Sequence, residues 1–587
     1  MRDVVIVGCG GGGPVVATEL ARWGLDVLVL EAGPRFADPR RDWSRLENDA
    51  NNPLTGYFRA GPGDRSKPAW SRDLPEDMFV WQVAGVGGTT LHYYGNCPRA
   101  ARGVFAGYDG PDAGEYDTTH RFPFTMAQLR PYYRWVEATL PVQTAAMGTK
   151  EERFLRAAAA TGLPVCDTKE PTEASFRPQE NCILQPGGTA GLAPDPSFPQ
   201  ASGCTFCGHC LQGCSAPRGA PRNLTAKRST DNSYVPMMLT ADVWAPGGRP
   251  AELVTGATVV RVHTEGRDAA TRATGVTYED AGGARHRVDA KVVVLAAGAV
   301  ETPRLWLDSG LPNPNGWVGR GLTDHHLDWV HGIFDDYTGS SKGASSSARI
   351  DFPGYGGIEN TGLPPAFEAF SATYSDHGTH GVYTNGSPAG DAGADAVGRL
   401  VGAQLLESVS NIDRVLNCLV ITDDDVEAEN RVQLSPAMPH DPKGTPPRIT
   451  VKHRQRSART RRNREFLARK AVELLRAAGA RKVYRADWPP LLLHIHSSMR
   501  MGHDPSDSVL DEWSESRFVT GLFVADNSAL PNSLGGANPT LTTQALATRA
   551  AERIMTRYFG GDPWVRNGTP TVSTDPRITD AVLARNL

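Results

Sequence analysis

The chain has 587 residues, with 61 Lys and Arg against 65 Asp and Glu, so its formal net charge is −4. Hydrophobic residues make up 40% and charged residues 21%, a mixture typical of a folded chain with a large core. The near-neutral balance argues against a nucleic-acid partner, and no apolar run reaches the ~18–20 residues of a membrane helix. The length predicts two or more domains or one very large α/β unit. Because no signal peptide opens the chain, we expect a cytoplasmic protein, unless a signal-bearing partner exports it.

The first expected element is a strand at Asp3–Val7 that runs into a glycine-rich turn. The turn contains G-x-G-x-x-G at Gly8, Gly10 and Gly13, a helical stretch follows, and a second strand ends at Glu31. In this context Gly8 allows the turn, Gly10 lets backbone reach a pyrophosphate, and Gly13 lets helix and strand pack. Glu31 can accept hydrogen bonds from ribose hydroxyls. The pattern predicts a bound dinucleotide, and it leaves FAD and NAD open.

Later segments are expected to complete the nucleotide-binding domain. Val292–Ala299 is an apolar run that ends in small residues, among them Ala297, and it suits a buried parallel strand whose carboxyl end meets a ligand. Val254–His263 and Ala273–Tyr278 are predicted as strands of a meander. Val260, in the first of these, is a candidate contact around the adenine, and a sheet without ligand contact is the alternative.

Four of the nine cysteines lie within eleven residues. Cys204, Cys207, Cys210 and Cys214 have the C-x2-C-x2-C-x3-C spacing of bacterial ferredoxins, in which the fourth cysteine serves another cluster. Soft thiolates hold iron–sulfur clusters or zinc. The spacing predicts an iron–sulfur cluster, [3Fe-4S] or [4Fe-4S], held by three or four of these thiols. Structural zinc, reduced packing cysteines and disulfides remain as alternatives.

Several ordered motifs resemble one family. They are Val86–Tyr93 (VGGTTLHY), Leu295–Pro303, Val318–His325 (VGRGLTDH), Asn430–Leu434, His494–Pro505 (HIHSSMRMGHDP), Leu522–Pro531 and Asn538-Pro539. Together they resemble the glucose–methanol–choline (GMC) oxidoreductases, a family of FAD enzymes, and the likeness extends from residue 1 to about residue 557. This ordered set is far more specific than the glycine motif alone.

The resemblance implies an α/β fold with a Rossmann-like FAD-binding domain, made of a parallel sheet and a β-meander, and an α+β substrate-binding domain on an antiparallel sheet. We expect the FAD-binding domain to comprise residues 1–130, 226–325 and 491–560. The substrate-binding domain is expected at 326–490, a cap segment with the cysteines at 131–225, and a C-terminal tail at 561–587.

The resemblance also implies where the cofactor lies. It places Gly87 and Gly88 against the flavin or the pyrophosphate, since glycine has no Cβ to collide with either. Asp526 is expected near the pyrophosphate or ribitol, and Asn538-Pro539 beside the cofactor. In some similar enzymes a histidine at the place of His92 is covalently joined to the flavin; in others it only packs beside the flavin, which is our expectation here.

For the chemistry, the resemblance makes His494 the catalytic base, with His496 as its rival. Imidazole suits this task because its ordinary pKa of ~6.5 lets it accept a proton near neutrality. Asn538 matches the second catalytic position, where an amide can hold the substrate oxygen but cannot take its proton. The usual Gly-Thr of the motif is replaced here by Ser497-Ser498.

The expected activity is FAD-dependent oxidation of an alcohol CH–OH group, with a sugar, polyol or glycoside favoured over an apolar alcohol. Electrons are expected to pass to an external acceptor or an electron-transfer subunit by way of the cysteine site. An oxidase that uses oxygen directly, a lyase that keeps FAD without redox turnover, and a non-catalytic electron carrier are the alternatives.

Overall fold

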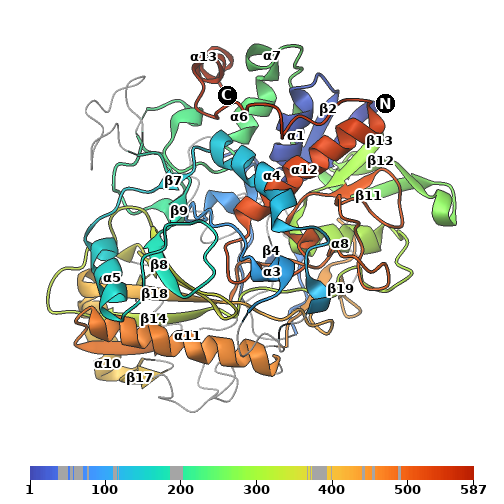
Figure 1. The fold of residues 1–587 in the computed structure, drawn as a ribbon. Helices are drawn as coiled ribbons and strands as arrows, with labels where there is room; N and C mark the ends of the chain where they lie inside the picture. The colour runs from blue at the N-terminus through green and yellow to red at the C-terminus, as the bar shows by residue number, and fades with distance from the viewer. Residues whose placement is uncertain are drawn as a thin grey trace.

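The computed structural model describes the chain apart from residues 37–50, 53–56, 59–69, 76–78, 110–115, 117, 186–202, 218, 366–367, 370–371, 373–392, 398–399, 439–442, 453–455 and 487–490. Two seven-stranded sheets dominate the fold (Figure 1). Within the described residues, no helix is long and apolar enough to cross a membrane.

One sheet is built around β1 (Arg2–Val7), which lies between and parallel to β2 (Val27–Glu31) and β13 (Arg285–Leu295). β10 (Glu252–Thr255) pairs with β2, and β23 (Leu522–Val524) pairs with the last residues of β13, both in parallel. β1, β2, β23 and the last four residues of β13 are rich in β-branched and aliphatic side chains that are buried on both faces, as in parallel sheets, whereas the edge strand β10 is partly exposed. Five segments from distant parts of the sequence therefore form one parallel sheet.

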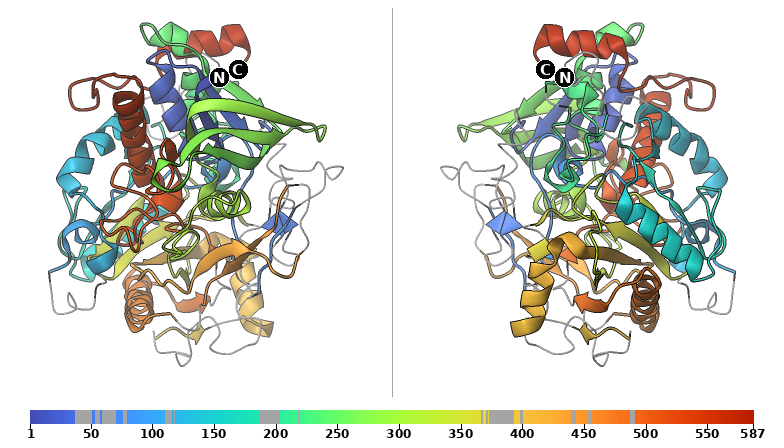
Figure 2. Two further views of the ribbon diagram at one scale, coloured as in Figure 1. Left: turned by 90° about the vertical axis from the view of Figure 1, so that its right-hand side faces the viewer. Right: turned by 90° about the vertical axis from the view of Figure 1, so that its left-hand side faces the viewer.

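An antiparallel meander continues this sheet. β11 (Thr258–Glu265) and β12 (Arg272–Glu279) pair with each other, and β12 pairs with the first half of β13. Figure 2 shows these green strands projecting from the side of the molecule. The single strand expected at Val254–His263 is wrong, because Gly256, with φ +66°, turns the chain and separates β10 from β11.

Buried helices pack against the parallel sheet and against one another. α1 (Gly13–Ala21) is buried along its whole length and packs on β2, on α6 (Tyr234–Leu239) and on α12 (Thr540–Tyr558). α4 (Met126–Thr139) packs on the outer side of α12. α8 (Gly298–Asp308) begins three residues after the end of β13. The small residues Gly, Ala and Thr of α1 and α12 allow this close packing.

The second sheet has the order β17 (Ala396–Val397), β21 (Lys482–Ala486), β14 (Asp328–Ile333), β18 (Val415–Thr422), β16 (Gly356–Thr361), β15 (Ala348–Phe352) and β8 (Ser175–Pro178). All neighbours are antiparallel except β17 and β21. α11 (Ala458–Ala477) and α5 (Thr149–Ala160) cover one face and share an apolar core with it (Figure 1). The predicted fold class, a parallel sheet with a meander beside an antiparallel sheet, is confirmed; the domain limits stay a prediction.

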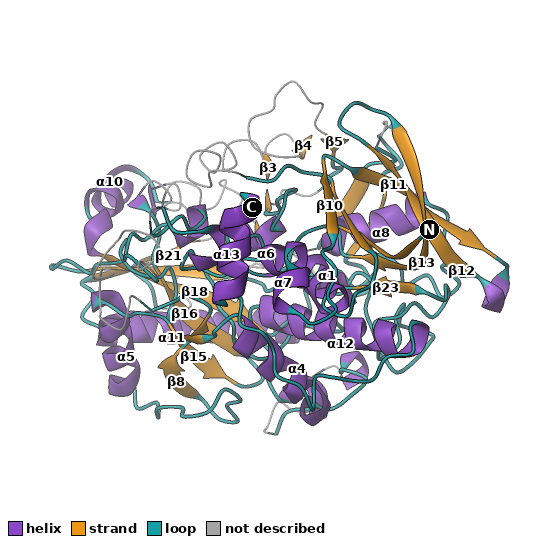
Figure 3. Ribbon diagram, turned by 90° about the horizontal axis from the view of Figure 1, so that it is seen from above, coloured by secondary structure: helices purple, strands orange, loops and turns teal. Residues whose placement is uncertain are grey.

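Shorter elements complete the described part of the chain (Figure 3). The strands are β3 (Asn51–Asn52), β4 (Tyr57–Phe58), β5 (Trp70–Ser71), β6 (Phe79–Val80), β7 (Gln143–Thr144), β9 (Glu180–Asn181), β19 (Arg431–Leu434), β20 (Pro447–Thr450) and β22 (Leu491–Leu492). The helices are α3 (Gly103–Ala106), α7 (Ala241–Trp244), α10 (Gly402–Ser410) and α13 (Pro576–Arg585).

Candidate active site

One cavity is lined by residues of both sheets and has a volume of about 230 Å³. Its lining runs from the carboxyl ends of β1 and β2 to Trp329 of β14 and Leu419 of β18. Ligands bind at the carboxyl ends of the strands in sheets of the first type. The predicted site residues that line it are Gly8, Gly10, Glu31, Gly88, His92, Ala297, His494, Asp526, Asn538 and Pro539.

The three motif glycines after β1 have three different reasons to be glycine. Gly8 has φ +105°, and a Cβ on it would lie 2.4 Å from the Ala296 carbonyl oxygen. A Cβ on Gly13 would lie 2.1 Å from the Gly8 carbonyl oxygen, so this residue lets α1 pack on the turn. A Cβ on Gly10 would meet no atom closer than 3.9 Å and would project into the cavity. Only Gly10 keeps space free for a ligand.

Glu31, at the end of β2, is fixed beside this turn. Its carboxylate accepts hydrogen bonds from the backbone N–H groups of Cys9, at 2.7 Å, and Gly33, at 2.8 Å. Burial raises the pKa of Glu31 above its ordinary value. The carboxylate is thus held at the cavity wall, where a ribose hydroxyl could reach it.

The second glycine segment packs directly on the first. Gly88 has φ +51°, and a Cβ on it would lie 2.7 Å from the Cα of Gly10. Gly87, at φ +103°, donates its N–H to the Cys9 carbonyl and does not line the cavity itself. His92 lines the cavity with its ring 5.2 Å from the ring of Trp81, and burial lowers the pKa of His92 well below 6.5.

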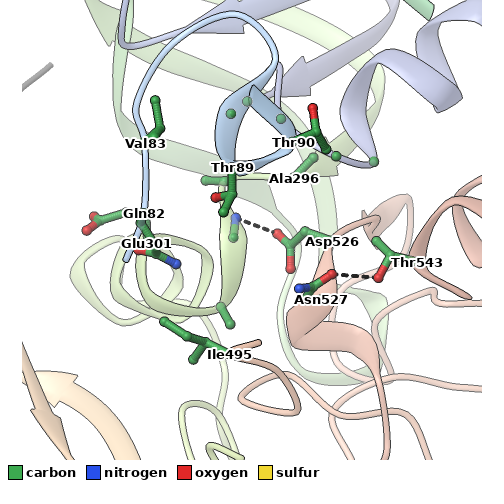
Figure 4. A pocket seen from close by; sticks show the side chains of 18 of the residues that line it. Gln82, Val83, Thr89, Thr90, Ala296, Glu301, Ile495, Asp526, Asn527 and Thr543 are labelled. Atoms are coloured by element: carbon green, nitrogen blue, oxygen red, sulfur yellow. Dashed lines mark hydrogen bonds between the residues drawn. The ribbon is translucent and has the colours of Figure 1, made fainter. Parts of the chain in front are cut away.

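Asp526 joins β23 to the start of α8 at the cavity wall. Its carboxylate accepts hydrogen bonds from the Gly298 N–H, at 2.9 Å, and the Thr302 hydroxyl, at 2.6 Å. Figure 4 shows Asp526 beside Asn527, whose side-chain oxygen accepts a hydrogen bond from Thr543 of α12 at 2.6 Å. Burial raises the pKa of Asp526. The N-terminal turns of α8 and α12 thus face one cavity, where backbone N–H groups favour an anion.

Gly13, Gly87, Val260 and His496 do not line the cavity. In β11 the residues that line the cavity are the first two, Thr258 and Val259, and Val260 lies beyond them. A cofactor contact through the Val260 side chain is therefore not supported, whereas its two neighbours are contact candidates.

The two candidate catalytic side chains meet in the cavity from different elements. His494 follows β22 and Asn538 precedes α12, and both line the cavity. Burial lowers the pKa of His494 well below its ordinary value, and the nearby His325 and Arg349 lower it further. His496 is fully buried away from the cavity, with its Nδ1 3.0 Å from the Ser497 hydroxyl. Of the two rivals, His494 lines the cavity and His496 does not.

His325 is a part of the site to which the sequence assigned no role. It ends the motif Val318–His325, which served only as a mark of family likeness, yet its Nδ1 lies 2.9 Å from Nδ1 of His494. The preceding Asp324 accepts the backbone N–H groups of Leu493, at 3.1 Å, and His494, at 2.8 Å. The segment before β14 therefore holds both the backbone and the ring of His494.

Two buried side chains of the second sheet orient Asn538. Arg349 of β15 lies 3.5 Å from the Asn538 side-chain oxygen, and Glu359 of β16 is hydrogen-bonded to the same side chain. Glu359 also accepts a hydrogen bond at 2.8 Å from Asn96, another residue of the cavity wall. No sequence pattern indicated these two residues, because they precede Asn538 by about 180 positions and come from another domain.

The four clustered cysteines line a second, small cavity. All are free thiols, and among the described residues no three His, Cys, Asp or Glu side chains are placed to hold a metal ion. The buried Lys227 also lines it and donates to the carbonyl oxygens of Leu91, Tyr93 and Cys210 at 2.7, 2.8 and 2.6 Å. Lys227 thus connects the cysteine loop to the segment that contains His92.

Curated relatives cover almost the whole chain. Paromamine 6'-oxidase of Streptomyces fradiae is 28% identical over 94% of this chain and 91% of its own length. 2-Methyl-1,2-propanediol dehydrogenase of Mycolicibacterium austroafricanum is 27% identical over 98% of this chain and 99% of its own. The fructose dehydrogenase large subunit of Gluconobacter japonicus is 27% identical over 94% and 97%.

Solved structures share the fold. Pyridoxine 4-oxidase of Mesorbium loti has a TM-score of 0.58 at 17% identity, over 96% of this chain and 100% of its own. Formate oxidase of Aspergillus oryzae has a TM-score of 0.60 at 14% identity, over 95% and 99%.

The family models of GMC oxidoreductase match residues 11–327 and 426–547, more than half of the chain. These ranges include Gly13 of the glycine turn, the His494 motif and Asn538. The chain belongs to the GMC oxidoreductase family and is an FAD-dependent oxidoreductase acting on CH–OH groups.

Proposed function

We propose that this protein oxidises the CH–OH group of a sugar, polyol or glycoside. The observation that carries the proposal is the convergence of His494 and Asn538 on the cavity that the dinucleotide turn also lines. Trp81, Tyr94 and Trp329 lie on its wall, and aromatic rings of this kind suit the C–H faces of a carbohydrate. The names of the relatives, among them paromamine oxidase and fructose dehydrogenase, favour the same class.

Each residue has a separate task in this reaction. His494 accepts the hydroxyl proton of the substrate, which is feasible because its lowered pKa keeps the imidazole neutral near pH 7. Asn538, oriented by Arg349 and Glu359, holds the substrate oxygen with an amide N–H. FAD, when bound, supplies a hydride acceptor at its N5 atom. Gly8, Gly10, Glu31, Gly88 and Asp526 are the residues that would hold it.

The position of His92 in the cavity wall favours a non-covalent contact with the flavin over a covalent bond. We propose that the ring packs beside the flavin, since it lies against Trp81, tilted by 44°, at the cavity wall. Its neutral state, favoured by burial, suits an apolar contact.

The test of the activity is anaerobic bleaching of the flavin by a panel of sugars, polyols and simple alcohols. We expect at least one sugar or polyol to bleach it, and His494→Ala to slow bleaching by at least ~100-fold, the usual contribution of a general base. His503→Ala, at an exposed position of the same segment, is the matched control and should bleach normally. Normal bleaching by His494→Ala would refute the base assignment, and absence of bleaching by every compound would favour a lyase or an electron carrier.

We propose that the electrons of the reduced flavin pass to an external acceptor through the small cavity lined by the four cysteines. Leu211 lines the large cavity and the preceding Cys210 lines the small one, so consecutive residues of the chain reach the two cavities. Four thiols around one cavity are the ligand type of an iron–sulfur cluster. Among the described residues, however, their positions in space are not those of metal ligands. Direct use of oxygen is the second candidate, since the relatives include oxidases. Hydrogen peroxide formed on aeration of the bleached enzyme would indicate it.

A further inference from the structure

Three histidine rings lie together at the cavity wall: His494 is half-buried and lines the cavity, and His325 and His496 are buried. The ring of His325 lies 4.9 Å from that of His494 and 5.7 Å from that of His496, in each case nearly perpendicular. The backbone around them is fixed, because Thr323 and His496 exchange N–H to carbonyl hydrogen bonds of 2.9 and 2.8 Å. Ring positions in this cluster are therefore defined by the fold.

Two hydrogen bonds of His325 determine where the protons of the cluster lie. Its Nε2 lies 2.9 Å from the Ser533 carbonyl oxygen, which can only accept, so Nε2 must carry the proton. A neutral imidazole has one N–H, so Nδ1 of His325 is then an acceptor. Burial supports the neutral form, because it lowers the pKa of His325 to about 4.

The consequence falls on His494. Because Nδ1 of His325 accepts, Nδ1 of His494, 2.9 Å away, must be the donor. A neutral His494 then has no proton on Nε2, and this nitrogen carries the free lone pair. The chain of donors runs from His494 through His325 to the Ser533 carbonyl.

We propose that His325 is a positioning residue that holds His494 in the Nδ1–H tautomer, so that Nε2 of His494 is the atom that takes the hydroxyl proton. The role in catalysis rests on the proposed function; the tautomer does not. When Nε2 gains the proton, the imidazolium still donates from Nδ1 to His325, which is a neutral acceptor. Because the partner of Nδ1 is the neutral imidazole of His325 and not a carboxylate, the proton is held weakly and can be released after each turnover.

The test uses the holoenzyme with two variants of His325. His325→Leu removes the acceptor, whereas His325→Asn keeps a side-chain oxygen near the place of Nδ1. In histidine-labelled ¹⁵N NMR, with His494 assigned from His494→Ala, we expect the Nδ1–H tautomer in the wild type and in His325→Asn, and its loss in His325→Leu. Anaerobic flavin reduction should slow by ~10–100-fold in His325→Leu and recover mostly in His325→Asn, with flavin content and substrate affinity little changed.

Two outcomes would overturn the proposal. One is an Nε2–H tautomer of His494 in the wild type, which needs no variant and no substrate to observe. The other is wild-type flavin reduction by a folded, flavin-loaded His325→Leu. Failure of the proposed function is recognised separately, because the flavin of the wild type would then be bleached by no compound of the panel, whatever tautomer the spectrum reports.

Discussion

The pKa of His494 sets how the enzyme responds to acid. A general base works only while it is unprotonated, and burial together with His325 and Arg349 keeps the pKa of His494 well below 6.5. We therefore expect the limiting rate of flavin reduction to be the same at pH about 6 and about 7.5, and to fall only at more acidic pH. Anaerobic stopped-flow measurements across this range check it, with His503→Ala as control. Loss of half the rate near pH 6.5 would contradict it.

Individual residues differed in how far the sequence could place them. His494 and Asn538 belong to ordered motifs, and the structure brings both to one cavity as the resemblance implied. His325 stood in a quoted motif without a role, because only the folded chain shows its ring beside His494. The sequence did not indicate a role for Arg349 and Glu359, because it does not distinguish a buried charged residue on a strand from an exposed one.

At the scale of elements, the first turn combines two kinds of glycine. Gly13→Ala should destabilise the fold, because its Cβ would lie 2.1 Å from the Gly8 carbonyl oxygen. Gly10→Ala should fold normally but bind FAD at least ~10-fold more weakly, because its Cβ meets only the cavity. Flavin content and thermal unfolding of the two variants, measured in parallel, separate the effects. Full flavin content in Gly10→Ala would show that this backbone does not approach the cofactor.

Local elements were easier to predict than their boundaries and pairings. β1, α1 and β2 follow from a strand, a glycine turn and a second apolar strand, which is local information. The break between β10 and β11 was missed because Gly256 interrupts a continuous β-branched pattern, and its φ of +66° is visible only in the structure. The pairing of β10 with β2, across more than 220 residues, also has no local signal.

At the scale of the whole molecule, the two cavities raise the question of how electrons leave. If the thiols of Cys204, Cys207, Cys210 and Cys214 hold a cluster, anaerobically purified protein should contain about three or four iron atoms and as many acid-labile sulfides per flavin. Cys210→Ser should remove them, and Cys166→Ser, outside this cavity, should not. Absence of iron from flavin-loaded wild type would refute the cluster and make peroxide formation the next assay.

The order in which the sheet is assembled has a consequence for how the protein is made. β1 is synthesised before its partner β13, which follows about 280 residues later, and β23 and α12 come later still, with α12 ending at Tyr558. During translation β1 can pair with β2 early, but its other edge stays unpaired until β13 has been synthesised. The cavity walls, drawn from residues 7 to 543, are complete only once Thr543 of α12 has been synthesised. We therefore expect the cofactor to be loaded late, and a ribosome-bound chain that ends at residue 537, before α12, should not retain flavin.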